Sequence, residues 1–455
     1  MMRALSLSEL VAPLSARLEG ENISVNAVST DTRSLPQGAL FVALRGERFD
    51  AHDFADQAVA NGAVALVVER LLPLDVPQLV VDDTRIALGA LGAYNRQLFS
   101  GRLYAITGSS GKTTVKEMLA AIMRESGETL ATRGNLNNEI GVPLTLLELQ
   151  PKDEFAVIEM GASGPNEIAY SVGLAKPHLA LVNNAMGAHL EGFGSLQGVV
   201  TAKGEIYDGL ADDGIGVVNI DDPHHADWLT RLGQKRVVTF SQQDTKATYH
   251  ARDIQLSANG CYRFVLCAPQ GEASVELKIM GQHNVSNALA AAALALADGR
   301  SLASVARGLA AFQPVAGRMR LETGVNRCRL VDDSYNANPG SVKAAISMLA
   351  ELPGERVLVL GDMGELGADA AQLHAQVGAY AAQQGIEHLF TVGELSVHAK
   401  MAYEEQRPSG AQHFAGKEQL VEELSQLAHS DMTVLVKGSR SAAMEQVVVN
   451  MRAEV

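Results

Sequence analysis

The sequence predicts an α/β protein built from three domains. Its 455 residues correspond to about three domains at roughly 150 residues each, and each is long enough to bury a core of its own. Short apolar runs alternate with helical patterns along most of the chain, which is typical of mostly parallel sheets covered by helices. Two interruptions of this pattern divide the chain into units 1–84, 85–313 and 314–455.

The first unit has the pattern of a small α/β domain. Apolar runs at 39–44 and 63–68 flank a helical pattern at 54–60, and a short strand is expected at 79–81. A helix rich in Ala and Leu is predicted at 84–98, and we place the first boundary at its start.

The second unit repeats the alternation of strand and helix. A stretch of more β-like sequence follows, then an Ala-rich helix at 285–297, and the Pro- and Gly-containing segment 312–317 marks the second boundary. The expected strands are 103–107, 155–159, 179–183, 216–220, 237–240, 262–266 and 274–280.

The third unit is predicted to be a second doubly wound, Rossmann-like α/β domain. In such domains ligands bind at the carboxyl ends of the strands. The expected strands are 329–333, 356–360, 388–392 and 433–436, separated by helices at 341–352, 368–384, 395–403 and 417–427.

Composition excludes several classes of protein. With 47% hydrophobic and 20% charged residues the chain is typical of a folded globular protein. Its longest apolar stretch, 288–297, is too short to span a bilayer, and the N-terminal residues do not resemble a secretion signal. Three cysteines without metal-ligand spacing favour a reducing cytoplasm. A net charge of −15 disfavours binding to a nucleic acid polymer, although not to a single nucleotide.

The strongest motif is the segment Thr107–Thr114, which follows a predicted strand and precedes a helix. Its glycines allow backbone N–H groups to surround a phosphate, Lys112 can reach the β- and γ-phosphates, and the Thr113 hydroxyl can hold Mg²⁺. The general P-loop pattern requires glycine at position 106, where this chain has Ile106. A Gly-Ser turn with a solvated lysine is the alternative.

Three further residues are candidates for the same site. Glu159 ends a predicted buried strand, where a carboxylate can hold a metal ion beside a P-loop; an exposed strand-end glutamate is the alternative. His189 follows the next strand, although imidazole suits Mg²⁺ less well than oxygen does. Taken alone, His189 is more typical of a loop histidine, and Lys203 of a solvated lysine at a helix start.

Two polar clusters lie at the ends of predicted elements. Asn284 and Asn287 share one helical face, where amides can contact a nucleobase or cap the helix. Segment 332–339 crowds two acids and two asparagines into one turn before a helix; capping explains Asn338 before proline but not the rest. Segment 437–440 can bring positive charge to an anion or form a solvated loop.

Together these motifs resemble the Mur ligases, ATP-dependent amide-forming enzymes of peptidoglycan precursor synthesis that are related to folylpolyglutamate synthetase. The resemblance covers essentially the whole chain. The family form of the P-loop, T-G-x-x-G-K-[ST], is met by 107–113 and accounts for Ile106. The resemblance implies a small N-terminal domain that binds a UDP-sugar, a central P-loop ATPase domain, and a C-terminal domain that binds the incoming amine.

The resemblance also implies roles for individual residues. Catalytic roles fall on Lys112, Glu159, His189 and Lys203, with Lys203 carbamylated as in several members. Metal ligands would be Thr113, Glu159 and His189. ATP contacts fall on Gly108, Ser109, Ser110, Gly111, Lys112, Thr113, Thr114, Asn284, Asn287, Arg318 and Asp333. Substrate contacts fall on Ser29, Asp31, Thr32, Arg33, Arg45, Gly46, Asn135, Asn138, Asn336 and Asn338.

Within the family, the chain looks most like the ligase that adds D-alanyl-D-alanine to UDP-N-acetylmuramoyl-tripeptide. The N-terminal segments 29–33 and 44–52 and the C-terminal segments 333–339 and 360–367 carry this likeness. The D-N-P-R motif of the diaminopimelate-adding members is absent, an absence that lysine-adding members share. The alternatives are an amino-acid-adding Mur ligase and a folylpolyglutamate-type ligase, and, from other classes, a P-loop switch or kinase and a binding protein.

The expected cofactors are ATP and two Mg²⁺ ions, with a carbamate on Lys203. The expected partners are the UDP-linked tripeptide and D-alanyl-D-alanine, without a nucleic acid polymer or a membrane span. A cytoplasmic monomer is expected, in which the third domain closes over the substrates.

Overall fold

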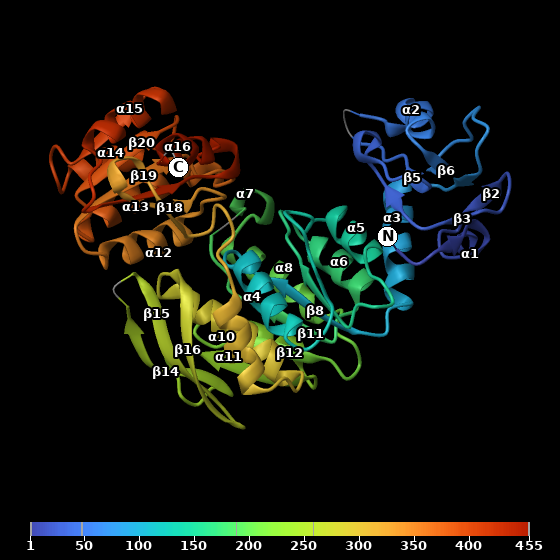
Figure 1. The fold of residues 1–455 in the computed structure, drawn as a ribbon, viewed down its shortest axis with the longest axis horizontal. Coiled ribbons are helices and arrows are strands. Elements are labelled where there is room, and N and C mark those ends of the chain that lie inside the picture. The colour runs from blue at the N-terminus through green and yellow to red at the C-terminus, as the bar shows by residue number, and fades with distance from the viewer. Residues whose placement is uncertain (1, 47–48, 188, 258, 454–455) are drawn as a thin grey trace.

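The computed structural model describes residues 2–46, 49–187, 189–257 and 259–453. It has three large sheets and a two-stranded ribbon, β1–β3. In Figure 1 the N-terminal part lies at the upper right, the C-terminal part at the upper left, and the largest sheet between and below them. The predicted α/β class with three units is confirmed.

A five-stranded sheet organises the N-terminal part, in the order β2-β7-β6-β5-β4. Its strands are parallel except β2, which pairs antiparallel with β7. The sequence predicted the middle of this sheet but missed the short strands before residue 30. The elements are β1 (Leu5–Ser6), α1 (Leu7–Val11), β2 (Arg17–Glu19), β3 (Ser24–Val25), β4 (Val28–Ser29), β5 (Ala39–Val42), α2 (Ala55–Ala60), β6 (Ala63–Val68) and β7 (Gln78–Val80).

Helix α3 (Thr84–Gln97) connects the first sheet to the second. Asp83 caps its N-terminus by accepting hydrogen bonds from the backbone N–H groups of Arg85 and Ile86. Apolar residues of α3 share a core with strands of the first sheet, while the helix also packs against α5 of the central part. A movement of the first sheet therefore acts directly on α3.

The central part is a nine-stranded sheet in the order β16-β15-β14-β13-β12-β11-β8-β10-β9. Neighbouring strands from β9 across to β14 are parallel, and β14 to β16 extend the sheet as an antiparallel meander. Strand β14 was not predicted from the sequence, because its second half is largely exposed. The strands are β8 (Arg102–Thr107), β9 (Thr129–Ala131), β10 (Phe155–Glu159), β11 (Leu179–Val182), β12 (Ile215–Asn219), β13 (Arg236–Ser241), β14 (Tyr249–Leu256), β15 (Cys261–Ala268) and β16 (Gly271–Met280).

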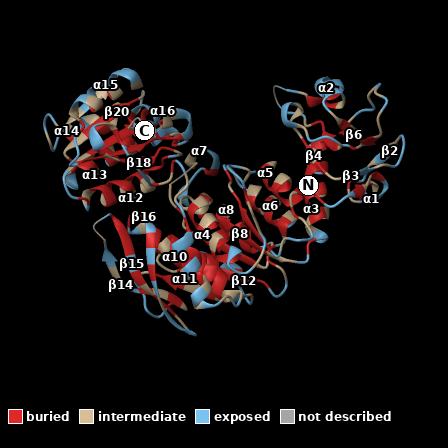
Figure 2. Ribbon diagram, in the orientation of Figure 1, coloured by how far each residue is buried: buried red, intermediate tan, exposed pale blue. Residues whose placement is uncertain are grey.

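Helices cover both faces of this sheet. Helix α10 is buried along nearly its whole length, as its red colour in Figure 2 shows, because it packs against the sheet and against α4 and α11. The helices are α4 (Lys112–Arg124), α5 (Gly141–Leu147), α6 (Glu167–Ala175), α7 (Leu190–Phe193), α8 (Leu196–Gly204), α9 (His225–Leu232), α10 (His283–Ala297) and α11 (Leu302–Ala311).

The C-terminal part is a six-stranded sheet in the order β17-β18-β22-β19-β20-β21, parallel except for β17. The four strands and four helices predicted here are found. The elements are β17 (Arg320–Thr323), β18 (Arg329–Asp333), α12 (Pro339–Ala350), β19 (Glu355–Gly361), α13 (Ala370–Gln383), β20 (His388–Val392), α14 (Val397–Glu404), β21 (Ala411–Phe414), α15 (Lys417–Leu427), β22 (Met432–Lys437) and α16 (Glu445–Met451).

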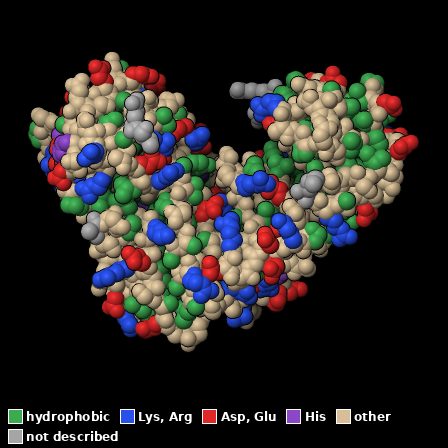
Figure 3. Space-filling view, in the orientation of Figure 1, with side chains coloured by type: hydrophobic (Ala, Val, Ile, Leu, Met, Phe, Trp, Pro, Cys, Tyr) green, Lys and Arg blue, Asp and Glu red, His purple; other side chains and the backbone are tan. Residues whose placement is uncertain are grey.

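The central and C-terminal parts are in direct contact beside α12. Met280, Met348 and Leu352 belong to one hydrophobic cluster that continues from one part into the other. At the same place the Tyr262 hydroxyl donates a hydrogen bond of 2.5 Å to Glu351. In the space-filling view, an open hollow separates the N-terminal and C-terminal parts (Figure 3).

Within the described residues, no helix combines the length and apolarity needed to cross a membrane. All three cysteines are buried and unpaired.

Candidate active site

A cavity of about 740 Å³ lies where strands β8 to β13 of the central sheet end. Its floor is the P-loop, and its walls come from the ends of β10, β12 and β13, the start of α10, and the segment after β18 in the C-terminal part. Parallel strands place their carboxyl ends at one edge, which is the usual position of ligand sites in α/β sheets. The cavity is therefore shared between two domains.

The P-loop has the expected strand-loop-helix form, between β8 and α4. Gly111 has φ of 76°, a conformation that favours glycine. The Lys112 ammonium donates a 2.7 Å hydrogen bond to the Gly108 carbonyl, across the loop that would surround a phosphate. Burial lowers the pKa of Lys112, with Glu159 opposing and Arg318 adding to this effect. A solvated lysine on a plain turn is thus inconsistent with the structure.

Asn183, directly after β11, fixes the P-loop and was not predicted as a site residue from the sequence. Its amide donates to the Ser110 carbonyl and to Asn287 Oδ1, each at 3.0 Å. The neighbouring Asn184 accepts from the Ser110 backbone N–H at 2.9 Å. Two adjacent asparagines directly after a strand were the available sequence signal.

Glu159 is buried at the end of β10, so the alternative of an exposed glutamate is wrong. One carboxylate oxygen accepts a 2.8 Å hydrogen bond from Asn137, whereas the other is buried with no hydrogen-bond partner in the part of the chain that the structure describes. An unpaired buried carboxylate oxygen is costly unless a cation or donor meets it. Glu159 thus fits the oxygen donor of a divalent cation site. Asn137, which was not predicted from the sequence, orients this carboxylate.

His189 lies at the N-terminal end of α7 and lines the cavity. Its ring Nδ1 contacts the carboxylate of Glu365, a residue of the C-terminal part. Burial lowers the pKa of His189; Glu365 opposes this effect, and Lys112 and Lys203 add to it. The histidine is therefore part of a contact between the two domains, which its position in the sequence did not reveal.

Lys203 is buried near the end of α8, so the interpretation as a solvated lysine at a helix start is wrong. Its ammonium lies 5.6 Å from the centre of the Phe193 ring. Burial lowers its pKa to about 7, with a further contribution from Lys112 and an opposing one from Glu167. A neutral amine is thus accessible near pH 7. The side chain does not line the cavity itself.

The side chains of Asn284 and Asn287 do lie on one face of α10, as predicted. Asn287 donates to Asn284 Oδ1 at 2.7 Å, and Asn284 donates to the Met280 carbonyl at 2.7 Å. The capping alternative is not observed, because Gln282 is the N-cap and makes no side-chain capping bond. Both residues line the cavity.

Arg318 brings positive charge from the segment between the domains onto the P-loop. Its guanidinium donates to Thr113 Oγ1 at 3.2 Å and lies 4.1 Å above the centre of the Tyr335 ring. Tyr335 was not assigned from the sequence. The aromatic face holds the guanidinium in one orientation.

Asp333 and Lys437 form a buried pair of 2.5 Å at the ends of two adjacent strands, β18 and β22. Lys437 also donates to the Asn336 carbonyl at 3.0 Å, so a solvated loop is excluded for this lysine. Asn338 caps α12 by accepting from the Ser341 backbone N–H at 2.8 Å, as predicted. Asn336 and Asn338 line the cavity.

The remaining predicted residues separate into two groups. Asn135 and Asn138 line the cavity beside Glu159. The six N-terminal residues do not line it and belong to the first sheet and its loops. There, Asp31 accepts three hydrogen bonds from Arg33, and Ser29 donates to the Asp31 carbonyl. Hydrogen bonding to Arg33 lowers the pKa of Asp31 to about 2. These N-terminal residues are Ser29, Asp31, Thr32, Arg33, Arg45 and Gly46.

No cluster of three or more His, Cys, Asp or Glu side chains suited to a metal ion occurs among the described residues. A cation at this site would thus depend on a mixed set of donors, including a hydroxyl. The P-loop, the unpaired carboxylate oxygen of Glu159 and the cations facing them define a P-loop enzyme that acts on a nucleoside triphosphate.

Comparison with family models identifies this enzyme further. Residues 24–95 match the Mur ligase family catalytic domain, 106–295 the Mur ligase middle domain, and 317–440 the Mur ligase glutamate ligase domain. The chain belongs to the Mur ligase family.

Individual relatives are similar over the full length. The chain is 50% identical over 451 residues to UDP-N-acetylmuramoyl-tripeptide--D-alanyl-D-alanine ligase of Escherichia coli (strain K12), covering 98% of both chains. The crystal structure of MurF from Acinetobacter baumannii superposes with a TM-score of 0.93 at 36% identity, covering 99% of both. MurF of Thermotoga maritima, solved in complex with ADP, gives 0.81 at 27% identity, covering 93% of this chain and 96% of that one.

Proposed function

We propose that this enzyme joins D-alanyl-D-alanine to UDP-N-acetylmuramoyl-tripeptide, using ATP, in peptidoglycan precursor synthesis. It is an ATP-dependent ligase that forms amide bonds. The observation that carries the proposal is the shared cavity, in which the P-loop and Glu159 face Arg318 of the connecting segment and Asp333 and Lys437 of the C-terminal domain. Full-length similarity to ligases of this name supports the choice of substrates.

The reaction requires an activated carboxylate. The terminal carboxylate oxygen of the tripeptide attacks the γ-phosphorus of ATP, the bond to the β–γ bridging oxygen breaks, and ADP leaves. The amine of the dipeptide then attacks the carbonyl carbon of the acyl phosphate, losing a proton, and phosphate departs. Both reactants of the first step are anions, so cations must reduce their repulsion.

Lys112 and Arg318 are placed to supply these cations. Lys112 spans the P-loop, and Arg318 contacts Thr113 at its end. Arg318 belongs to the segment that joins the central and C-terminal domains. We infer that its contact with Thr113 responds to domain closure, which would exclude water from the acyl phosphate.

The residues present fit a Mg²⁺ ion, for which Thr113, Glu159 and His189 would be the ligands. Bound there, Mg²⁺ would neutralise charge on the transferred phosphoryl group. The unpaired oxygen of Glu159 supports this assignment, and Asn137 orients the same carboxylate.

Lys203 is proposed to carry a carbamate, which would replace a cation by an anion able to bind a second metal ion. Only an uncharged amine adds CO₂, and the lowered pKa of this lysine favours that form. We expect Lys203→Ala to lose activity, and a small carboxylate such as acetate to restore part of it. No restoration at any concentration would argue against the carbamate but not against the ligase reaction.

We further propose that the domains extend over 1–84, 85–313 and 314–455 and bind the UDP end, ATP and the dipeptide, respectively. Ser29, Asp31, Thr32, Arg33, Arg45 and Gly46 would then bind the UDP-substrate, with Asn135, Asn138, Asn336 and Asn338 nearer the reacting groups. We also propose that the enzyme is a cytoplasmic monomer; the three unpaired cysteines support the reducing compartment.

The deciding experiment measures phosphate released from ATP with Mg²⁺ and UDP-muramoyl tripeptide, with and without D-alanyl-D-alanine, and identifies products by mass spectrometry. Phosphate and UDP-muramoyl pentapeptide should appear only with both substrates. Turnover driven instead by glutamate or diaminopimelate would reject the dipeptide and retain the family.

A further inference from the structure

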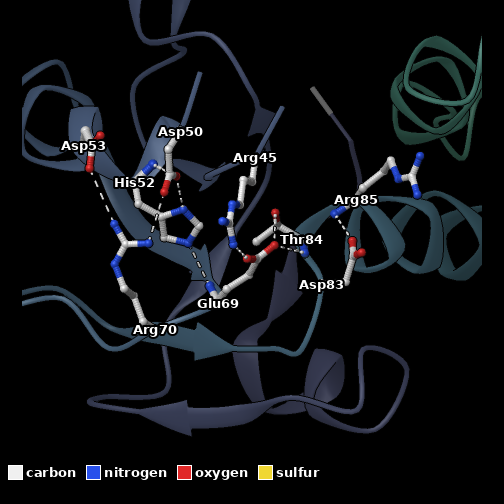
Figure 4. Close-up of polar contacts among 9 residues, drawn as sticks. All are labelled: Arg45, Asp50, His52, Asp53, Glu69, Arg70, Asp83, Thr84 and Arg85. Atoms are coloured by element: carbon white, nitrogen blue, oxygen red, sulfur yellow. Dashed lines mark hydrogen bonds and ion pairs between the residues drawn. The ribbon is translucent and has the colours of Figure 1, made fainter. Parts of the chain in front are cut away.

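A polar cluster outside the ATP cavity links the N-terminal sheet to α3. It lies beyond the ends of β5 and β6 and contains Arg45, Asp50, His52, Glu69 and Thr84 (Figure 4). Two of its side chains, His52 and Thr84, are buried, and buried polar groups are stable only when they are hydrogen-bonded.

His52 lies at the centre of the cluster, and its side chain is fully buried. Ring Nδ1 lies 2.6 Å from Asp50 Oδ1, while ring Nε2 accepts a 2.8 Å hydrogen bond from the Glu69 backbone N–H. Because Nε2 is an acceptor, the ring proton lies on Nδ1 and is donated to Asp50. The histidine thus joins two separate loops through both of its nitrogens, as Figure 4 shows.

Asp50 fixes the backbone at Arg45. The two residues form an antiparallel bridge, and the Asp50 carboxylate accepts hydrogen bonds from the His52 backbone and from Arg70. Burial opposes ionisation of Asp50, but these hydrogen bonds lower its pKa to about 2. The main chain that carries Arg45 is therefore paired with that of Asp50, whose own carboxylate is ionised and hydrogen-bonded.

Glu69 faces the side chain of Arg45 and the first residue of α3 together. One carboxylate oxygen accepts from both the backbone N–H and the hydroxyl of the buried Thr84, each at 3.2 Å. The other oxygen lies 3.9 Å from the Arg45 guanidinium. The same carboxylate therefore orients the arginine and holds the start of the helix that leads to the P-loop strand.

Arg45 and the neighbouring Arg70 differ in how fully their charges are paired with carboxylates. Arg70 is paired with both Asp50 and Asp53. Arg45 has only the loose contact with Glu69 within the described residues, and its side chain is 68% exposed. The backbone of Arg45 is fixed, its side chain is oriented by Glu69, and its guanidinium has unused N–H donors. Such a group suits a phosphate or diphosphate ligand.

We propose that His52 and Glu69 are positioning residues that direct the Arg45 guanidinium toward the diphosphate of the UDP-linked substrate and connect it to the first turn of α3. This inference rests on the proposed function, since it takes the UDP end of the substrate as the ligand. Through Thr84, occupation of the diphosphate site would also stabilise the orientation of α3, which packs on both domains.

The test uses uridine 5′-diphosphate as the probe in titration calorimetry, together with steady-state kinetics on the full-length enzyme. Glu69→Gln keeps an acceptor for Thr84 but releases the guanidinium. Its dissociation constant for UDP and its KM for the UDP-substrate should rise roughly 3- to 10-fold, the cost of ordering one long side chain on binding. The KM for ATP and kcat should stay unchanged. Asp53→Ala, which removes only an exposed partner of Arg70, is the matched control.

A double-variant cycle separates positioning from a general structural effect. In an Arg45→Ala background, Glu69→Gln should cause no further loss of UDP affinity, because the residue it orients is absent. His52→Gln, whose amide can still donate and accept, should retain more UDP affinity than His52→Phe. This second pair covers the case in which a Glu69 variant fails to fold.

Three results would overturn the inference: tighter UDP binding by Glu69→Gln, which would mean that Glu69 only competes with the ligand; unchanged binding; or the same loss with and without Arg45. A wild-type enzyme that binds no UDP would instead refute the proposed substrate, and the inference with it.

Discussion

Gly111→Ala is the substitution for which the structure gives the clearest magnitude. A Cβ atom there would lie 2.5 Å from Asn287 Oδ1 and 2.6 Å from Asn183 Nδ2, the two atoms that are hydrogen-bonded to each other. The left-handed backbone adds a penalty of about 1 kcal/mol for a side chain, and losing the buried hydrogen bond adds about 2 kcal/mol. The expected loss is about 3 kcal/mol, a large part of the roughly 5–15 kcal/mol of a typical domain.

The chain offers a matched control and a local probe. Gly299 also has positive φ, but apart from its chain neighbours no described residue has an atom within 4 Å of the position that an alanine Cβ would take there, so Gly299→Ala should cost only about 1 kcal/mol. Trp228 is the single tryptophan and is buried in the central domain, so its fluorescence during urea denaturation reports this domain. Gly111→Ala should also weaken ATP binding more than about tenfold. Equal destabilisation by the two substitutions would refute the proposed packing at the P-loop.

Two buried lysines and the arrangement of the domains give three further expected outcomes, two for stability and one for the size of the molecule. Lys437→Met leaves the buried Asp333 carboxylate without its partner and should destabilise the C-terminal domain by about 3 kcal/mol; circular dichroism in urea checks this, and adding Asp333→Asn should restore part of the loss. The pKa of Lys203 is about 7 in the folded protein, against an ordinary value of 10.5. Between these two pH values the unfolded chain binds more protons than the folded one, so the free energy of unfolding should rise with pH over this range. Lys203→Met should abolish that rise. The check is the free energy of unfolding of the wild type minus that of the variant, followed with pH; a wild type and variant with the same pH profile would contradict the burial argument. Finally, ATP with the UDP-substrate should reduce the radius of gyration in small-angle scattering, and an unchanged radius would reject closure of the hollow seen in Figure 3.

Local sequence was enough for much of the fold. Apolar runs with β-branched residues identified β10 and β20 at their observed bounds, because strands buried on both faces have a largely apolar pattern. Strands such as β14 were missed because an exposed, polar strand has no such pattern. Helix α3 was predicted as an element, although its packing against two domains depends on contacts distant in sequence.

The candidate site divides in the same way. The sequence by itself determined the phosphate loop, since its glycines, lysine and threonine are adjacent along the chain and act through local backbone geometry. It also placed Glu159 at a strand end. Only the tertiary structure decided that one oxygen of Glu159 is unpaired and that Lys203 is buried. Burial and pairing depend on neighbours contributed by distant segments, such as Glu365 beside His189, and those neighbours fix the charge each side chain carries.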